Sequence, residues 1–251
     1  MARLSELLAS PLPDEAAAAQ QKAYVTYSLS RLPAAAPAQI TLLESRNLIS
    51  AGGTTGLRTW EAALHLGQYL CGQQALVAGQ RVLELGAGTG YLSILCARFL
   101  AARQVIASDG SDDVVANLPE NFYVNGLQDS DVVSAMDVKW GHALVGTEEA
   151  EWNGGRPIDL VLGADVTYDE SVIPSLVAML DDLFDLFPRV VTLIAATERN
   201  RQTLEAFLAG CRQRRFEVHE VEFELPPKAR QTGPFYSDLV PIRICRITRA
   251  T

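Results

Sequence analysis

Short apolar runs alternate with longer amphipathic stretches through much of the chain. An apolar run of four to seven residues between turn-forming residues predicts a buried strand, whereas apolar positions spaced three and four apart predict a helix. Strands that alternate with helices form a parallel sheet with helices on both faces. The pattern predicts strands at 81–85, 104–108, 131–134, 158–163 and 190–196, and helices at 91–100, 112–124, 171–186 and 201–212.

The last two apolar runs, at 216–222 and 237–247, have no helix between them. A parallel pair needs a crossover connection, so these strands are expected to pair antiparallel at one edge of the sheet. The connection between them is rich in turn-forming residues, namely Pro226, Pro227, Gly233 and Pro234. The chain is therefore predicted to be an α/β protein with a mostly parallel sheet and an antiparallel C-terminal hairpin.

A further helix is expected before the first of these strands, with Thr59 as its N-terminal cap. Its apolar stripe consists of Trp60, Ala63, Leu64, Leu66, Leu70 and Cys71. Residues 1–40 are rich in alanine and proline, and we expect a helix over 13–29 followed by an extended segment over 30–41. We therefore divide the chain into a short N-terminal extension, 1–42, and one domain, 43–251.

The composition is that of an ordinary soluble domain, because 48% of the 251 residues are hydrophobic and 20% are charged. The net charge of −9 repels phosphate backbones, so nucleic acid is not expected as a partner. No apolar run approaches the roughly 18 residues that span a bilayer. Charged and proline residues occupy the N-terminus, where a signal peptide has an apolar core. We expect a monomer without a membrane partner, located in the cytoplasm, with the nucleus open as an alternative.

Cysteine and histidine are too dispersed to form a recognisable metal site. The four cysteines show no Cys-x-x-Cys spacing, and three of them lie among apolar residues. Free thiols in a reducing compartment are the simplest interpretation. The three histidines are equally scattered, so no bound metal is expected. These residues are Cys71, Cys96, Cys211, Cys245, His65, His142 and His219.

A turn with three glycines, Gly86, Gly88 and Gly90, follows the first strand and precedes a helix. Glycine permits positive φ angles and the close approach of a ligand, and the helix N-terminus offers free N–H groups. The dinucleotide fingerprint places its third glycine three residues after the second, but Gly90 comes only two after Gly88. The Gly-Lys-Ser/Thr sequence of a P-loop is also missing. The turn therefore indicates a ligand without a diphosphate, with a purely structural turn as the alternative.

Two carboxylates at the ends of the first two strands suggest what that ligand is. S-adenosylmethionine has no phosphates, but it has a cationic sulfonium and an amino acid tail. Glu84 supplies negative charge near that tail, and Asp109 can accept both ribose hydroxyls. Asp109 would serve NAD equally well, and it could also be an ordinary turn carboxylate. The pair indicates an adenosyl ligand, and the glycine spacing favours S-adenosylmethionine.

Later strand ends add aromatic and acidic candidates. Trp140 follows the third strand and could stack on adenine, although it could also be a core residue, as could Trp60. Asp165 and Tyr168 lie at the carboxyl end of the fourth strand, where ligands bind in open α/β sheets. The alternative is a helix-capping Asp165 beside a partly exposed Tyr168. Val166 and Thr167, rather than two prolines, directly follow Asp165, which argues against methylation of an exocyclic base amine.

Together these features resemble the family-16 seven-β-strand protein-lysine methyltransferases. The resemblance rests on the glycine turn, Asp109, Trp140 and the 165–168 segment. The run 44–63, which reads ESRNLISAGGTTGLRTWEAA, is also similar to a segment of the enzymes that methylate a lysine of translation elongation factor 2. The glycine turn is common to many methyltransferases, so the 54–63 part of this run is the more specific match.

The resemblance implies a Rossmann-like, seven-stranded class I methyltransferase sheet and a protein-lysine N-methyltransferase activity. It implies translation elongation factor 2 as the protein partner and S-adenosylmethionine as the cofactor. Asp165 and Tyr168 would face the substrate lysine, where Asp165 either acts as a base or only orients the amine. The cofactor would be lined by Trp60, Glu84, Gly86, Asp109, Trp140 and Ala164, besides the backbone of Gly88 and Gly90 in the turn.

Three other interpretations stay open at this point. The enzyme could methylate another protein or a small molecule. It could also be a non-catalytic subunit that binds a partner, although both the intact turn and Asp109 argue against a lost cofactor site. Arg212, Arg214 and Arg215 could contact RNA, but cations at a helix C-terminus also favour the helix dipole without any ligand.

Overall fold

The structure, a computed structural model, describes residues 22–32, 38–45, 55–142, 155–224 and 226–250. A seven-stranded sheet has the order β5–β4–β3–β6–β7–β9–β8. The strands from β5 to β7 run parallel, and β9 is antiparallel to both β7 and β8. The strands are β3 (Arg81–Leu85), β4 (Gln104–Asp109), β5 (Val133–Asp137), β6 (Leu160–Ala164), β7 (Val191–Thr197), β8 (Phe216–Val221) and β9 (Ile242–Arg249).

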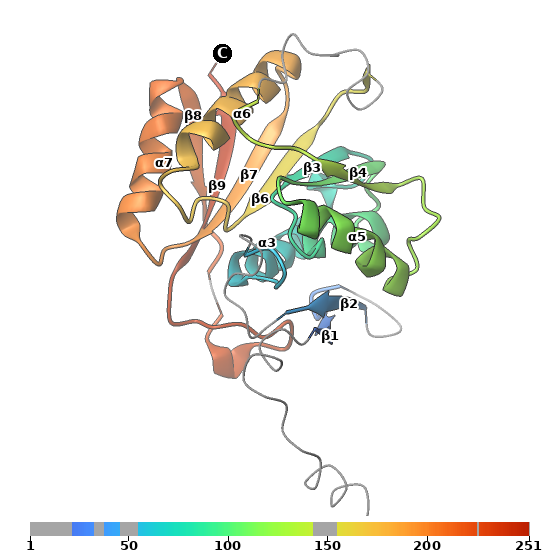
Figure 1. Ribbon diagram of the computed structural model, residues 1–251. Coiled ribbons are helices and arrows are strands. Elements are labelled where there is room, and N and C mark those ends of the chain that lie inside the picture. The colour runs from blue at the N-terminus through green and yellow to red at the C-terminus, as the bar shows by residue number, and fades with distance from the viewer. Residues whose placement is uncertain (1–21, 33–37, 46–54, 143–154, 225, 251) are drawn as a thin grey trace, which may run out of the picture.

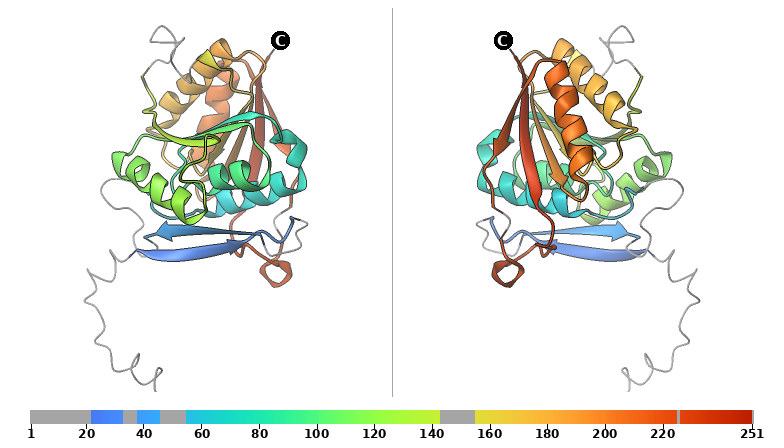
Figure 2. Two further views of the ribbon diagram at one scale, coloured as in Figure 1. Left: turned by 90° about the vertical axis from the view of Figure 1, so that its right-hand side faces the viewer. Right: turned by 90° about the vertical axis from the view of Figure 1, so that its left-hand side faces the viewer.

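Helices cover both faces of this sheet, as Figures 1 and 2 show. Leu66 and Leu92, from the helices α3 and α4, belong to one buried apolar cluster. Leu180 and Phe207, from α6 and α7, belong to a second cluster on the other face. The helices are α3 (Glu61–Gly72), α4 (Tyr91–Phe99), α5 (Asp112–Val124), α6 (Ile173–Leu186) and α7 (Arg201–Gln213), with short 3-10 helices at Gln74–Leu76 and Lys228–Arg230.

The predicted α/β alternation and the antiparallel C-terminal hairpin are confirmed. The bounds of β3 and α5 are the predicted ones, and the other predicted elements of the sheet shift at their ends. The largest shift is in the last strand, which begins at Ile242 rather than at residue 237. Pro241 lies directly before it and has no N–H to donate to a strand ladder. None of the described helices combines the length and apolar character needed to cross a membrane.

The helix predicted over 13–29 is wrong wherever the structure describes it. Strand β1 (Ala23–Ser28) pairs antiparallel with β2 (Gln39–Glu44) in a separate two-stranded sheet. Val25, Tyr27 and Leu29 alternate with more exposed neighbours, which is the period of a strand rather than of a helix. Residues 13–21 and 33–37 of the two predicted segments lie outside the described residues. The domain boundary between residues 42 and 43 stays a prediction, and β2 runs across it.

Helix α5 binds the β1–β2 hairpin through two buried asparagines. Asn121 Oδ1 accepts a hydrogen bond from the backbone N–H of Leu43 at 2.7 Å. Asn125 bonds to both the N–H and the carbonyl of Thr41, at 3.1 and 2.6 Å. These side chains satisfy backbone groups on the edge of β2 that faces away from β1, an edge that would otherwise invite pairing with another chain. The hairpin, visible beneath the helices in Figure 2, is therefore fixed to the main domain.

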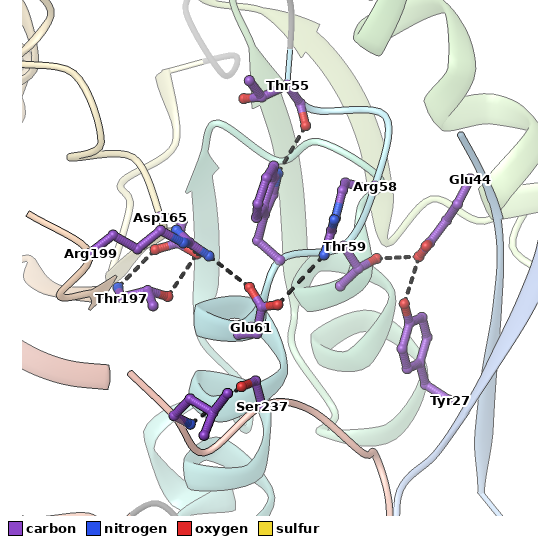
Figure 3. Close-up of polar contacts among 12 residues, drawn as sticks. Tyr27, Glu44, Thr55, Arg58, Thr59, Glu61, Asp165, Thr197, Arg199 and Ser237 are labelled. Carbon is purple, nitrogen blue, oxygen red and sulfur yellow. Dashed lines mark hydrogen bonds and ion pairs between the residues drawn. The ribbon is translucent and has the colours of Figure 1, made fainter. Parts of the chain in front are cut away.

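A buried polar network continues from the hairpin to the glycine turn. Glu44 Oε1 accepts hydrogen bonds from Tyr27 at 2.9 Å and from Thr59 Oγ1 at 2.6 Å (Figure 3). The Thr59 hydroxyl also lies 2.7 Å from that of Thr89, in the turn before α4. The prediction that Thr59 caps α3 is wrong, because the N-cap residue is Trp60 and the Thr59 side chain is engaged in this network. The network fixes the start of α3 relative to the turn.

We expect Asn121→Ala to lower the free energy of unfolding by about 2–4 kcal/mol, because two buried backbone groups lose a partner. These are the N–H of Leu43 and the carbonyl of Thr89, to which Asn121 Nδ2 donates at 2.9 Å. Asn117→Ala is the matched control on the same helix, because among the described residues the Asn117 side chain bonds to the Lys22 ammonium and to no backbone group. Denaturant unfolding measures both. Equal losses in the two variants would contradict the role of Asn121.

Candidate active site

A cavity of about 710 Å³ opens at the carboxyl ends of β3, β4 and β6. Parallel strands end at the same edge of a sheet, so side chains far apart in sequence meet there. Every residue that the sequence singled out lines this cavity except Gly90. The lining residues from that set are Trp60, Glu84, Gly86, Gly88, Asp109, Trp140, Ala164, Asp165 and Tyr168.

The glycine turn has a backbone that other residues would strain. Gly86, Gly88 and Gly90 have φ angles of 64°, 54° and 80°. A Cβ on Gly86 would lie 2.8 Å from Val166 Cγ1, and one on Gly88 would lie 3.0 Å from the carbonyl oxygen of Gly56. A Cβ on Gly90 would instead meet Leu118 of α5 at 2.8 Å. Gly86 and Gly88 therefore allow the turn to lie close to Val166 and Gly56, whereas Gly90 allows close packing of α4 against α5.

Asp109 is held beside the turn by backbone N–H groups. Its Oδ2 accepts a hydrogen bond from the N–H of Gly88 at 3.1 Å, and its Oδ1 accepts one from Ser111 at 3.0 Å. Burial raises the pKa of the Asp109 carboxyl, and these backbone bonds oppose the rise. Each oxygen keeps acceptor capacity, so the carboxylate can receive two hydroxyl groups from a ligand.

Glu84 is almost fully buried at the end of β3, with 3% of its surface exposed. Its Oε2 accepts hydrogen bonds from the backbone N–H of Ser93, at 2.9 Å, and from the Ser93 hydroxyl. Ser93 belongs to the first turn of α4, where the helix dipole favours negative charge. Burial nevertheless outweighs these bonds and raises the pKa of Glu84 to about 8. A cationic ligand group in the cavity would favour the ionised form.

Two half-buried indoles face the cavity. Trp60 Nε1 donates to the carbonyl of Thr55 at 2.9 Å, which fixes the ring at the start of α3. Trp140 follows β5 and approaches the turn, because its Cζ2 lies 3.7 Å from where a Cβ on Gly86 would be. Trp140 also packs against the apolar cluster of α6 and α7. The Trp140 ring could therefore stack on a planar ligand in the cavity, and it also packs against the protein core.

Asp165 follows β6 in a left-handed backbone conformation, with a φ angle of 53°. Its Oδ1 accepts a hydrogen bond from the N–H of Thr197 at 2.8 Å, and its Oδ2 accepts one from Thr197 Oγ1 at 2.9 Å. Asp165 caps no helix, since α6 begins at Ile173 with Val172 as its N-cap. Tyr168, three residues later on the same turn, is 58% exposed. The structure thus orients the Asp165 carboxylate and leaves the Tyr168 ring largely exposed.

Sequence reasoning missed the residues that surround Asp165. Thr197 is the last residue of β7, and Arg199 follows it in the segment before α7. Arg199 Nη1 lies 3.4 Å from Asp165 Oδ2, and Arg199 Nη2 lies 2.7 Å from Glu61 of α3 (Figure 3). The sequence does predict that β7 ends at the same edge of the sheet as β6, so its last residues could lie near Asp165. It does not identify which of their side chains contact Asp165.

Other chemistry is sparse in the part of the chain that the structure describes. Within the described ranges no cluster of His, Cys, Asp or Glu could hold a metal ion. All four cysteines are buried free thiols, as expected. Arg214, considered above for an RNA contact, pairs with Asp181 of α6.

Comparisons with known proteins agree with this geometry. Residues 43–213 match the family model described as lysine methyltransferase. The protein-lysine N-methyltransferase EFM3 of Chaetomium thermophilum is 61% identical over 250 residues, which cover 99% of this chain and 74% of that protein. EFM3 of Saccharomyces cerevisiae is 32% identical, covering 84% and 66%, and human protein-lysine N-methyltransferase EEF2KMT is 34% identical, covering 67% and 53%.

Solved structures share the fold at low sequence identity. A precorrin-6y C5,15-methyltransferase from Geobacter metallireducens matches with a TM-score of 0.52 at 12% identity, covering 74% of this chain and 87% of that one. A SAM-dependent O-methyltransferase from Thermotoga maritima matches with a TM-score of 0.51 at 12% identity, covering 88% and 77%. These likenesses support the Rossmann-like methyltransferase fold alone. With the family match over most of the domain and the 61% identical relative, the chain belongs to the lysine methyltransferase family.

Proposed function

We propose that this protein is an S-adenosylmethionine-dependent N-methyltransferase that modifies a lysine of translation elongation factor 2 in the cytoplasm. Membership of the lysine methyltransferase family supports the reaction class. The similarity of 44–63 to enzymes that act on this factor supports the substrate, although residues 46–54 of this run lie outside the described residues. The observation that carries the proposal is one cavity with Asp109 on one side of the glycine turn and Asp165 on the other.

The residues of the cavity fit S-adenosylmethionine. The volume of about 710 Å³ suits a ligand of this size. Asp109 would accept the ribose hydroxyls, Trp140 would stack on adenine, and Glu84 would lie near the amino acid tail. The positive φ angles of Gly86 and Gly88 shape the turn that forms part of the cavity wall. When bound, this cofactor supplies an electrophilic methyl group on a cationic sulfur.

The acceptor side must receive a lysine and hold it as a neutral amine. A lysine has a pKa of about 10.4 in water, so it loses a proton before it can act as a nucleophile. Asp165, whose carboxylate Thr197 fixes, would accept a hydrogen bond from the amine. Tyr168 would close over the bound side chain and exclude water. These residues position the acceptor, which is where most of the rate acceleration would arise.

Incubation with labelled S-adenosylmethionine and purified elongation factor 2 tests the function directly. We expect label on a lysine of the factor with the wild-type protein, and at most traces with Asp109→Ala under the same conditions. A whole-cell lysate in a parallel reaction tests the substrate. Label on another protein, on RNA or on a small molecule would refute the elongation factor as substrate. Bound cofactor without any transferred label would indicate a non-catalytic binding subunit.

Two carboxylate variants separate the donor and acceptor sides. We expect Asp109→Ala to raise the Kd for S-adenosylhomocysteine by about ten- to a hundredfold, because each hydrogen bond to a charged group contributes about 1.5–3 kcal/mol. Asp165→Asn should lower kcat and leave this Kd unchanged, since asparagine retains an acceptor for the Thr197 N–H. Calorimetry and initial rates measure the two effects. A parallel loss of cofactor affinity in Asp165→Asn would move Asp165 to the donor pocket.

Glu84 should make stability depend on pH. The unfolded chain loses the Glu84 proton near the ordinary value of 4.5, whereas the folded protein keeps it until pH is about 8. The unfolded state therefore binds fewer protons across this window, and stability falls as pH rises through it. We expect Glu84→Gln to remove this part of the fall, because glutamine still accepts from the Ser93 N–H. Denaturant unfolding of both proteins at pH 5.5 and 7.5 measures this difference in stability. An identical pH dependence in the two proteins would contradict a raised pKa for Glu84.

A further inference from the structure

A cation already lies against the carboxylate that the proposed function gives to the substrate amine. Two nitrogens of the Arg199 guanidinium, Nη1 and Nη2, lie 3.4 and 3.5 Å from Asp165 Oδ2 (Figure 3). The Asp165 side chain is only 7% exposed, so water screens this contact weakly. Arg199 itself is not a cavity-lining residue, and its side chain is 41% exposed. Arg199 lies in the segment between β7 and α7 and reaches Asp165 from there.

Arg199 is anchored independently of Asp165. Its shortest ion pair is with Glu61 at 2.7 Å, and its guanidinium carbon lies 4.9 Å from the centroid of the Trp60 ring. Arg58 contacts the same two residues, at 3.5 Å from Glu61 Oε1 and 4.2 Å from the Trp60 centroid. Two guanidinium groups therefore share one indole and one carboxylate. With Asp165 included, this cluster has two positive and two negative charges, and its formal charge is zero.

This balance matters for the chemistry of a lysine acceptor. An uncompensated carboxylate beside an amine favours the ammonium form and raises the amine pKa. Such a site would bind the lysine well but keep it protonated and unreactive. A guanidinium paired with the same carboxylate cancels most of that field, while the carboxylate oxygens keep acceptor capacity for a hydrogen bond. Asp165 could then orient the amine without holding its proton.

We propose that Arg199 is a positioning residue that offsets the charge of Asp165, so that the substrate lysine enters as a neutral amine. The proposal rests on the proposed function, in which Asp165 lies on the acceptor side. Thr197 fixes the carboxylate and Glu61 fixes the guanidinium, so neither partner depends on the other for its place. Arg199 makes no contact with substrate in this arrangement and acts through Asp165.

The remaining charged groups near this contact come from the elements packed around it. On the side of α3 these are Arg58 and Glu61, which pair with each other and with Arg199. On the β7–α7 segment, Glu198 lies 4.0 Å from Arg201. Among these groups Arg199 is the cation that forms an ion pair with Asp165. The other titratable groups lining the same cavity are Tyr168, Glu84, Tyr91, Asp109, Asp112, Asp113 and Lys139.

The pH dependence of methylation tests the proposal, with purified elongation factor 2 as substrate. We expect Arg199→Gln to move the kcat profile about one unit toward higher pH, which is about a tenfold loss of kcat near pH 7 that recovers at alkaline pH. KM for the factor should fall or stay unchanged, and Arg199→Lys should restore most of the wild-type profile. A purely structural role would lower kcat equally at every pH. That result would overturn the proposal.

Arg201→Gln is the matched control, because it removes one arginine charge two residues away. Arg201 pairs with Glu205 at 2.8 Å, and its side chain is 78% exposed. We expect its kcat profile to match that of the wild type. Thermal unfolding of each variant checks that the fold is retained. If Arg199→Gln does not fold, a smaller shift in the same direction in Arg199→Lys is the expected result, and no shift overturns the proposal.

A second measurement separates this proposal from the choice of substrate. n-Butylammonium chloride is a probe for the lysine side chain, and its binding can be followed through the Trp60 indole N–H signal in NMR spectra. We expect Arg199→Gln to bind this cation about tenfold more tightly than the wild type and Arg201→Gln do. Equal affinities would overturn the role of Arg199 even if elongation factor 2 is methylated. Tighter binding without methylation of the factor would refute the proposed substrate alone.

Discussion

The parallel register of β3, β4, β6 and β7 is the constraint on which the rest of the site depends. Leu85 lies opposite both Ser108 and Gly163, and Ala164 lies opposite Ala195. The loops that follow these strands therefore begin at nearly the same height along the strand direction, at one edge of the sheet. The glycine turn, Asp109 and Asp165 reach one cavity for this reason, and the end of β7 lies beside Asp165. A one-residue slip would turn each side chain to the opposite face.

The two sides of the cavity are held by different kinds of contact. Asp109 is fixed by N–H groups of neighbouring turns, so its position follows from the local backbone of β3 and β4. The side around Asp165, the proposed acceptor side, is assembled from separate elements, because Thr197 comes from β7 and Glu61 from α3. The hairpin contributes indirectly, since Glu44 holds Thr59 directly before Trp60. A substitution in the β1–β2 hairpin can thus shift Trp60 and its neighbours at the cavity without altering the seven-stranded sheet.

The sequence predicted what depends on local pattern and missed what depends on contacts between distant segments. The glycine turn, the strand-end acids and the α/β alternation each lie within a few consecutive residues. The pairs Asp165–Thr197 and Glu61–Arg199 are 32 and 138 residues apart, and no local pattern identifies them. The β1 strand was hidden for another reason. Its alternation has only three apolar positions, over residues 25–29, and it follows a run of alanines, which favours helix by intrinsic propensity.

The backbone at Asp165 shows that this position is occupied by aspartate for its side chain. Its φ angle of 53° is in the left-handed region, where glycine would avoid a cost of order 1 kcal/mol. Aspartate and asparagine tolerate this conformation better than other residues, because a short polar side chain can bond locally. Here the side chain bonds instead to Thr197, on the neighbouring strand, and ties the turn after β6 to the end of β7. Glycine would relieve the strain but remove both the tie and the negative charge that Arg199 balances. The strained conformation is thus retained together with the carboxylate that faces the cavity.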